Sequence, residues 1–286
     1  MKIKGVNISN TAADKQWGFT EASRPRFSKG ENGVGVLICH GFGGTPANMR
    51  CLFERAVKLG CTADMPLLTG HGTTLADMED STYADWRRDV NASLDRLTAA
   101  GCSKIVLCGL SMGALLMADL AERKAGLELI DGLMLICPPV KLKRYLDICS
   151  WLAPLIPYVE TREDFPSPDM EMYFGMASRS LKDLKYLGDS VRRHTGAIDM
   201  PTLLVEAGRD NRVDPASYRI LRERIPQAEY VLMEDAVHGI PYSDKAEELC
   251  DLFEGFLNGF IEAAKQAALN AQEELPKQSA EPCAEE

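Results

Sequence analysis

The sequence lacks any apolar run long enough to cross a lipid bilayer. Spanning the hydrocarbon core takes roughly 20 consecutive apolar residues, and no stretch of the 286 residues approaches that length. The residues that follow Met1–Gly5 also lack the apolar core of a signal peptide. We therefore expect a cytoplasmic protein without stable insertion into a membrane.

Paired cysteines are missing as well. The nine cysteines are scattered, and none forms a Cys-x-x-Cys pair or a Cys/His spacing that suits zinc. Cys39, Cys108 and Cys137 lie inside apolar runs, where a thiol usually behaves as a small core residue. This pattern predicts reduced thiols, and we expect neither a metal ion nor an organic cofactor.

Positive charge is also scarce. The chain has 32 Lys and Arg residues against 42 Asp and Glu residues, which gives a net charge of −10. Because phosphate binding requires clustered cations, this balance argues against a nucleic-acid partner. Part of the acidity lies near the C-terminus, where residues 265–286 turn to Gln, Glu, Pro, Ala and Ser. We expect this segment to be an acidic, disordered tail.

In place of these missing features, the sequence has a regular alternation of strand and helix signals. Val34–Cys39 is a continuous apolar run, which is typical of a strand buried on both faces. Further strands are expected near 61–65, 104–108, 129–137, 202–206 and 229–233. Helices are expected near 45–60, 82–99, 215–225 and 245–264, and directly behind Ser111. This alternation predicts an α/β fold, with a mostly parallel sheet covered by helices on both faces.

The alternation stops between residues 139 and 199. This stretch has several prolines and many bulky, flexible apolar side chains, so we expect a mostly helical lid inserted above the sheet. The predicted organisation therefore has four parts. They are an N-terminal extension packing on the core (1–33), the core itself (34–138 and 200–264), the lid (139–199) and the tail (265–286).

Ser111 stands at a turn between a predicted strand and a predicted helix, in the segment Gly109-Leu110-Ser111-Met112-Gly113. A serine at such a turn is strained and exposed, and flanking glycines allow the strand and helix to approach closely. The helix that starts at the serine also directs its free N–H groups toward the reacting group. Ser111 is therefore the candidate nucleophile.

A serine hydroxyl needs a base to take its proton. His238 lies in the loop after the last predicted strand, and in a parallel sheet that loop emerges at the same edge as the Ser111 turn. Asp210 follows the strand 202–206 and reaches this edge too. Its carboxylate can orient the imidazole and stabilise its protonated form. His238 is the candidate base and Asp210 the candidate acid.

Other residues could compete for these roles. Asp214 is the rival acid, but it precedes a proline and occupies the position of a helix N-cap. His40 and His71 both precede glycine in turns, and we interpret them as structural hydrogen-bonding residues around the site. His194 lies near the end of the insertion and is expected to face solvent or the lid hinge.

Taken together, these motifs resemble the α/β-hydrolase superfamily, and within it the bacterial carboxylesterases and monoacylglycerol-lipase-like enzymes. Each motif is weak alone, but they follow the family's order over about residues 34–260. The matching segments are His40–Pro46, Gly70–Thr74, Asp85-Trp86, Gly109–Gly113, Gly208–Asp210 and Val237-His238. The resemblance implies an oxyanion hole formed by the backbone N–H groups of Phe42 and Met112.

The function that this resemblance predicts is hydrolysis of carboxylic esters through an acyl-enzyme on Ser111. The composition of the lid favours medium-chain acyl esters or monoglycerides as substrates. Members of this superfamily also act on thioesters, amides, lactones and carbon–carbon bonds, so these activities are alternatives. A ligand-binding protein that keeps the fold without catalysis is a further alternative. The sequence does not indicate an oligomeric state.

Overall fold

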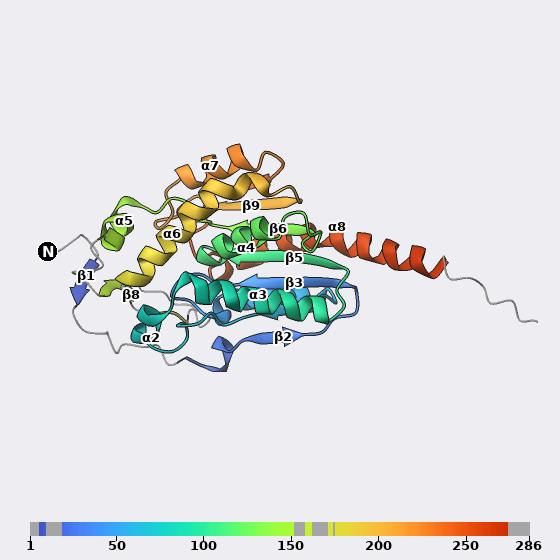
Figure 1. The fold of residues 1–286 in the computed structure, drawn as a ribbon, viewed down its shortest axis with the longest axis horizontal. Helices are drawn as coiled ribbons and strands as arrows, with labels where there is room; N and C mark the ends of the chain where they lie inside the picture. Colours follow the sequence, from blue (N-terminus) through green and yellow to red (C-terminus); the bar gives the residue numbers. More distant parts are fainter. Residues whose placement is uncertain (1–5, 10–18, 152–157, 162–170, 174, 274–286) are drawn as a thin grey trace, which may run out of the picture.

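A sheet of seven strands forms the centre of the computed structural model, which describes residues 6–9, 19–151, 158–161, 171–173 and 175–273 (Figure 1). The strands are β2 (Arg26–Ser28), β3 (Val34–Cys39), β4 (Thr62–Met65), β5 (Lys104–Leu110), β6 (Gly132–Ile136), β9 (Thr202–Ala207) and β10 (Glu229–Met233). Their order in space is β10-β9-β6-β5-β3-β4-β2. All neighbours run parallel except β2, which pairs antiparallel with β4. The predicted α/β fold is therefore confirmed.

The central strands are apolar because helices cover both of their faces. Every residue of β3 and of β6 is buried, and in β5 only Lys104 is not. Strands of a parallel sheet with two covered faces read as continuous apolar runs rather than as alternating ones. The edge strand β10 is more open, and only Met233 is fully buried there. This burial explains why the sequence indicated the central strands so clearly.

Helices pack on both faces of the sheet. Outside the insertion, the helices are α1 (Arg50–Lys58), α2 (Leu75–Asp80), α3 (Tyr83–Ala99), α4 (Met112–Arg123), α7 (Ala216–Arg224) and α8 (Ala246–Glu273), with short 3-10 turns η1 (Glu21–Ser23), η2 (Pro46–Met49), η3 (Thr195–Ala197) and η4 (Ile240–Tyr242). Of these, α2 contacts α6 and β8 of the inserted segment. In Figure 1, α3 and α4 lie in front of the sheet and α8 runs behind it. The start of α3 is specified locally, because Thr82 and Asp85 form a capping box.

The inserted segment contains more than helix. It has α5 (Arg144–Trp151) and α6 (Ser178–His194), and α6 packs against α4. It also has β7 (Tyr158–Thr161) and β8 (Gly175–Ala177), which form a small antiparallel sheet with β1 (Val6–Ser9) near the N-terminus. The sequence pattern did not predict these strands. They are three or four residues long, too short for a periodic signal, and the partner β1 is remote in sequence.

Helix α8 is longer than the sequence analysis predicted. It was expected to end near residue 264, but it continues to Glu273 and extends well past the sheet (Figure 1). The prediction of a disordered tail is therefore wrong for residues 265–273, where Ala, Gln, Lys and Glu favour helix. The rest of that prediction, 274–286, lies outside the described residues. Among the described residues, none of the helices has the length and apolar character needed for a bilayer crossing.

Candidate active site

Ser111 occupies a sharp turn between β5 and α4. Its φ of 55° and ψ of −116° lie outside the conformations that most residues adopt. Its backbone N–H donates to the carbonyl oxygen of Ile136 on the neighbouring strand at 2.7 Å, and α4 begins at the next residue, Met112. The turn therefore presents the serine at the N-terminus of a helix, as the sequence motif predicted.

The two glycines of the motif are required by close backbone contacts. A Cβ at Gly109 would lie 2.4 Å from the backbone of Gly113. A Cβ at Gly113 would lie 2.3 Å from the carbonyl oxygen of Cys39 at the end of β3. Both distances are far below any van der Waals contact, and backbone atoms cannot turn away. The strand, the turn and the helix can pack this tightly only without side chains at these two positions.

Asp210 and His238 are hydrogen-bonded to each other. Nδ1 of His238 donates to Oδ2 of Asp210 at 2.8 Å, and the two side chains are 9% and 5% exposed, respectively. The other carboxylate oxygen, Oδ1, accepts the backbone N–H groups of Arg212 at 2.7 Å and Val213 at 2.9 Å. Burial raises the pKa of the Asp210 carboxyl, but these hydrogen bonds outweigh burial and the pKa is lowered overall. Asp210 is therefore held as a carboxylate facing the imidazole.

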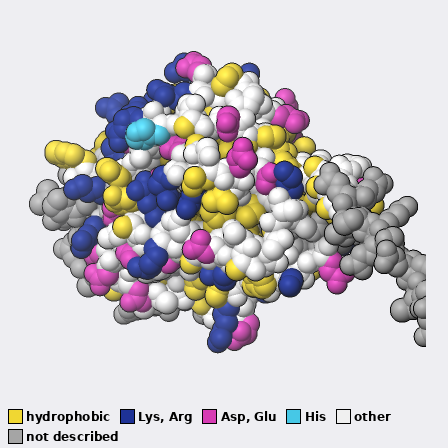
Figure 2. Space-filling model, turned by 45° about the vertical axis from the view of Figure 1, so that its right-hand side comes forward, with side chains coloured by type: hydrophobic (Ala, Val, Ile, Leu, Met, Phe, Trp, Pro, Cys, Tyr) yellow, Lys and Arg dark blue, Asp and Glu magenta, His cyan; other side chains and the backbone are white. Residues whose placement is uncertain are grey.

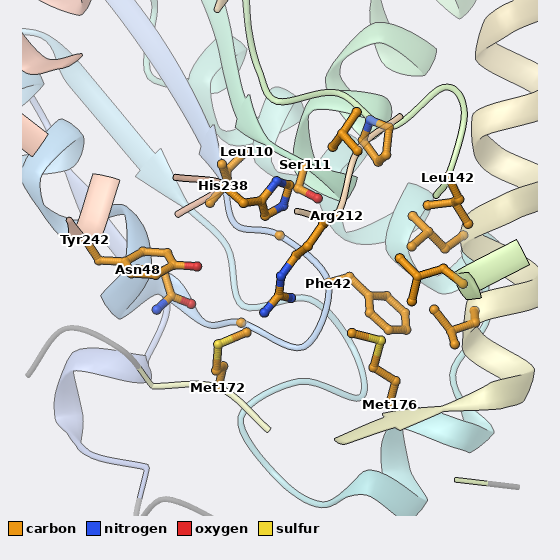
Figure 3. A pocket seen from close by; sticks show the side chains of 17 residues that line it. Phe42, Asn48, Leu110, Ser111, Leu142, Met172, Met176, Arg212, His238 and Tyr242 are labelled. Carbon is orange, nitrogen blue, oxygen red and sulfur yellow. The ribbon is translucent and has the colours of Figure 1, made fainter. Parts of the chain in front are cut away.

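Ser111 and His238 line the same pocket, which contains about 570 Å³ of empty space. Figure 3 shows the imidazole of His238 beside the hydroxyl of Ser111 at one wall of this pocket. Counted over the whole residue, Ser111 is 8% exposed and His238 is 7% exposed. The three residues that the sequence analysis selected are therefore gathered at one edge of the sheet, although 127 positions separate the first from the last.

The remaining walls of the pocket differ in chemistry from one side to the other (Figure 3). One side is apolar and comes mainly from α5, α6 and the segment before α5. Its residues are Pro139, Leu142, Leu146, Met176, Leu181 and Leu184. The opposite side carries polar groups from Asn48, Arg212 and Tyr242. The sequence analysis missed these three residues, because no motif signals that they converge.

His40 supports the loop that contains Phe42. Nε2 of His40 accepts the backbone N–H of Leu68 at 3.1 Å, so its Nδ1 carries the proton and donates to the carbonyl oxygen of Gly41 at 2.9 Å. That carbonyl belongs to the same peptide group as the N–H of Phe42, so His40 orients this group. Burial lowers the pKa of His40 to about 3. It is a neutral structural residue, as predicted.

His71 lies next to His40 in an aromatic cluster. Its ring centre is 5.1 Å from that of His40, 6.3 Å from that of Phe42 and 6.0 Å from that of Trp86. Nδ1 of His71 donates to the carbonyl oxygen of Thr69 at 3.2 Å, while Nε2 is buried without a partner among the described residues. Burial lowers the pKa of His71 to about 4. His71 contacts the Phe42 ring and does not line the pocket that contains Ser111.

The other two rivals lie apart from Ser111. Asp214 accepts the backbone N–H of Ala216 at 2.9 Å and forms an ion pair with Lys141 at 3.1 Å, which is the behaviour of a residue at a helix start. His194 is exposed in the last turn of α6. Figure 2 shows a histidine bordering a group of Lys and Arg side chains on this face. Neither residue lines the pocket.

One group of side chains at the site has the donor types of a metal centre. Cys137, Asp210 and His238 place a sulfur, an oxygen and a nitrogen within 4.8 Å of one another, and no other such group occurs among the described residues. However, the nitrogen and the oxygen are hydrogen-bonded to each other at 2.8 Å, so Nδ1 carries a proton and has no lone pair for a metal ion. The arrangement fits a hydrogen-bonded cluster better than a metal site.

The parallel sheet, the serine on a strand-to-helix turn and the aspartate–histidine pair at the same edge define the α/β-hydrolase class of proteins. Within this class, the chain belongs to the family described as serine aminopeptidase, S33, which matches residues 31–245.

Curated relatives of this chain are ester hydrolases. Over 209 residues it is 34% identical to a thermostable monoacylglycerol lipase of Bacillus sp. (strain H-257), a match that covers 70% of this chain and 80% of the relative. It is 26% identical over 194 residues to a carboxylesterase of Bacillus subtilis (strain 168), covering 66% and 77% of the two chains. A solved structure of the metagenome-derived lipolytic enzymes LipS and LipT superposes with a TM-score of 0.75 at 25% identity, covering 84% of this chain and 98% of that one. These similarities support ester hydrolysis by a serine hydrolase.

Proposed function

We propose that this protein hydrolyses carboxylic esters with a catalytic triad of Ser111, His238 and Asp210. The observation that carries the proposal is the 2.8 Å hydrogen bond between His238 and Asp210, in a pocket that His238 shares with Ser111. This is the arrangement in which an imidazole can remove the serine proton while a carboxylate stabilises the resulting positive charge.

The reaction has two halves. In the first, His238 takes the proton of Ser111 as the hydroxyl attacks the ester carbonyl, and then gives that proton to the leaving alcohol. In the second, His238 activates a water molecule that releases the acid from the acyl-enzyme. Asp210 keeps the imidazole in the tautomer that has a free Nε2 facing the serine. No step requires a cofactor.

The oxyanion formed during attack is bound, in this proposal, by the backbone N–H groups of Phe42 and Met112. Two features support this assignment. Met112 is the first residue of α4, so its N–H belongs to the free N-terminal turn of a helix. The peptide group of Phe42 is fixed from its carbonyl side by Nδ1 of His40 at 2.9 Å. Preorganised donors of this kind often supply the largest single contribution to catalysis.

The apolar side of the pocket supports an ester with an apolar acyl group as the substrate. Four leucines and Met176 face this side, and apolar walls favour a hydrocarbon chain over water. The monoacylglycerol lipase among the relatives is consistent with a medium-chain acyl ester or a monoglyceride. The lid, residues 139–199 in our division of the chain, supplies most of these side chains.

Labelling with a fluorophosphonate tests the proposed nucleophile. We expect one covalent adduct on Ser111 in the folded protein, located by peptide mass spectrometry, and none in a Ser111→Ala variant. A matched control is Ser81→Ala, which replaces a buried serine that does not line the pocket and should label normally. An absence of adduct on Ser111 in wild type would favour a ligand-binding protein that keeps the fold.

A chain-length series of p-nitrophenyl esters tests the substrate class. We expect kcat/KM to rise from acetate to medium-chain esters, because each added methylene buries apolar surface, at about 0.8 kcal/mol per CH₂. If kcat/KM does not change with chain length, or is highest for acetate, the apolar side of the pocket does not bind the acyl chain. Parallel assays with thioesters, amides and lactones decide between ester hydrolysis and the related activities.

A further inference from the structure

The polar side of the active-site pocket contains a cation. Arg212 is half-buried, and it lines the pocket together with Ser111 and His238. Among the described residues that line this pocket, Arg212 alone has a permanent charge, and none has a carboxylate. A guanidinium in a pocket with apolar walls attracts an anion more strongly than one in water, because its surroundings screen the charge less. The pocket is therefore suited to a substrate that carries negative charge.

The backbone of Arg212 is fixed by the same carboxylate that orients His238. Its N–H donates to Oδ1 of Asp210 at 2.7 Å, and its carbonyl oxygen accepts the N–H of Lys143 at 3.4 Å. In Figure 3 the side chain extends from the wall near His238 into the pocket, and its guanidinium points toward the polar side. The cation therefore has a defined place relative to the imidazole.

Tyr242 provides a second donor on this side. It ends the turn η4, and its N–H donates to the carbonyl oxygen of Gly239 at 3.1 Å. A Cβ at Gly239 would lie 2.3 Å from carbon atoms of the Tyr242 ring, so the ring packs directly on the backbone of that glycine. Arg212 follows Asp210 by two positions, and Tyr242 follows His238 by four. The loops that hold the proposed acid and base therefore also hold the two donors.

The chemistry of the two donors selects an anion with several oxygens. Arg212 and Tyr242 each interact with another group of the chain, but a guanidinium has five N–H donors. A partner within the protein therefore leaves donors for a ligand. The planar fork of these donors matches the two oxygens of a carboxylate or of a phosphate, and a phenol hydroxyl can donate a further hydrogen bond.

The anionic group belongs to the alcohol half of the ester. In the proposed function, the apolar side of the pocket takes the acyl chain, and a charge placed there would lose its hydration without gaining a polar partner. Arg212 and Tyr242 lie on the opposite side. His238, which gives its proton to the leaving alcohol in that reaction, is carried by the same loop as Tyr242. The alcohol therefore leaves next to the two donors.

We propose that the pocket selects esters whose alcohol part carries a carboxylate or a phosphate, which Arg212 binds with support from the Tyr242 hydroxyl. This inference rests on the proposed function and names the class of substrate for that site. A neutral glycerol ester fits the same side but offers the guanidinium only hydroxyl groups, so it is the poorer substrate.

The test measures kcat/KM for two pairs of esters that share an octanoyl group. One pair is octanoylglycerol and octanoylglycerol phosphate, and the other is O-octanoyl-lactamide and O-octanoyl-lactate. Wild type should prefer the anionic member of at least one pair by about ten- to a hundredfold, the size of a hydrogen bond to a charged group. The pair with the larger preference identifies phosphate or carboxylate as the group that binds. Equal values within both pairs, or higher values for the neutral members, would overturn the proposal.

Variants of Arg212 show whether this residue causes the preference. Arg212→Gln should bring the ratio of anionic to neutral kcat/KM close to one, and Arg212→Lys, which keeps the charge without the fork, should retain part of it. The ratio cancels effects that alter both esters alike, such as a shift of Asp210. Arg209→Gln is the matched control, because Arg209 belongs to the same loop but pairs with Asp235 at 2.6 Å and does not line the pocket. If Arg212→Gln keeps the ratio of wild type and Arg209→Gln, Arg212 does not bind the anionic group.

Binding without turnover separates this inference from the proposed function. In a Ser111→Ala background, the anionic ester of the preferred pair should bind more tightly than its neutral partner by calorimetry. Adding Arg212→Gln should remove that difference. A wild type without a fluorophosphonate adduct on Ser111 would overturn the proposed function even if the anionic ester binds. A labelled, active wild type that binds and hydrolyses both members of each pair equally well would overturn this inference alone.

Discussion

Around Ser111, each side chain has a separate hydrogen-bonding task. Asp210 accepts a hydrogen bond from His238, and His40 donates one to the peptide group that joins Gly41 to Phe42. In the proposed reaction, neither residue attacks the ester. The two supports differ in charge. Asp210 is an ionised acceptor, whereas burial keeps His40 neutral by lowering its pKa to about 3. Substitutions at these residues should therefore damage catalysis in different ways.

Replacing Asp210 by Asn should reduce kcat severely while the fold is kept. The amide oxygen would take the place of Oδ1, which accepts two backbone N–H groups. The NH₂ group would then face Nδ1 and donate to it, so the imidazole would carry its proton on the wrong nitrogen. The same change in a serine protease lowers kcat about 10⁴-fold, and we expect a loss of that order in steady-state ester hydrolysis. Asp214→Ala is the control. It removes a helix cap worth about 1 kcal/mol but should leave kcat unchanged, and an equal loss in both variants would contradict the assignment of the acid.

Replacing His40 by Ala should lower kcat with little change in KM. The substitution removes the donor to the Gly41 carbonyl and the acceptor for Leu68, so the Phe42 N–H is less well oriented. Loss of a whole oxyanion donor costs about 10²–10³ in kcat, and a loosened donor should cost less than that. His40→Asn keeps a side-chain N–H near the position of Nδ1 and should recover part of the activity. A rise in KM at constant kcat would point to substrate binding instead.

At the scale of elements, β3, β5 and α4 meet with almost no space between their backbones. The contact is made at Gly109 and Gly113, where an added Cβ would lie within 2.4 Å and 2.3 Å of neighbouring backbone atoms. This close packing holds the Ser111 turn rigid. In the inserted segment, α6 packs against α4 and α5, and both α5 and α6 contribute to the apolar side of the pocket.

Replacing Gly113 by Ala should destabilise the fold and remove activity. The new methyl group would lie 2.3 Å from the carbonyl oxygen of Cys39, so β3 and α4 would have to separate, at a cost of about 1–3 kcal/mol. Gly255→Ala is the matched control, because nothing lies within 4 Å of a Cβ there and the residue is inside α8. That variant should gain about 0.5–1 kcal/mol. Urea unfolding of both variants checks the prediction, which equal stabilities would contradict.

On the scale of the whole molecule, two buried neutral histidines link stability to pH. The pKa of His40 is lowered to about 3 and that of His71 to about 4, from an ordinary value of 6.5. Between these values the unfolded chain binds protons that the folded chain excludes. The free energy of unfolding therefore decreases as the pH falls below about 6.5.

This decrease should reach about 1.4 kcal/mol per pH unit for each histidine. Urea unfolding between pH 7.5 and pH 4.5 measures it. His71→Phe fills the aromatic cluster without a titratable ring. It should reduce the slope of the unfolding free energy against pH by the contribution of one histidine, about 1.4 kcal/mol per pH unit. His194→Gln changes an exposed histidine and should leave the slope as it is. If the slope is unchanged in His71→Phe, the pKa of His71 is not lowered in the folded protein.

Much of the fold was predictable because the central strands carry their own signal. Burial on both faces makes β3 and β5 continuous apolar runs, and local caps such as the Thr82–Asp85 box define where helices begin. The small sheet of β1, β7 and β8 was not predictable, since its strands are short and its pairing joins distant segments. The extension of α8 beyond residue 264 was missed because an acidic, alanine-rich composition was interpreted as a tail.

By itself, the sequence determined the candidate nucleophile, base and acid. Ser111 depends on the glycines two positions to either side, and Asp210 and His238 depend on the strands directly before them. These requirements are local, because they involve residues that are close together in the sequence. Only the tertiary structure decided that His40 meets Leu68, that Cys137 lies close to Asp210 and His238, and that the pocket has an apolar and a polar side. Such contacts arise where separate elements pack together, and no local pattern of residues encodes them.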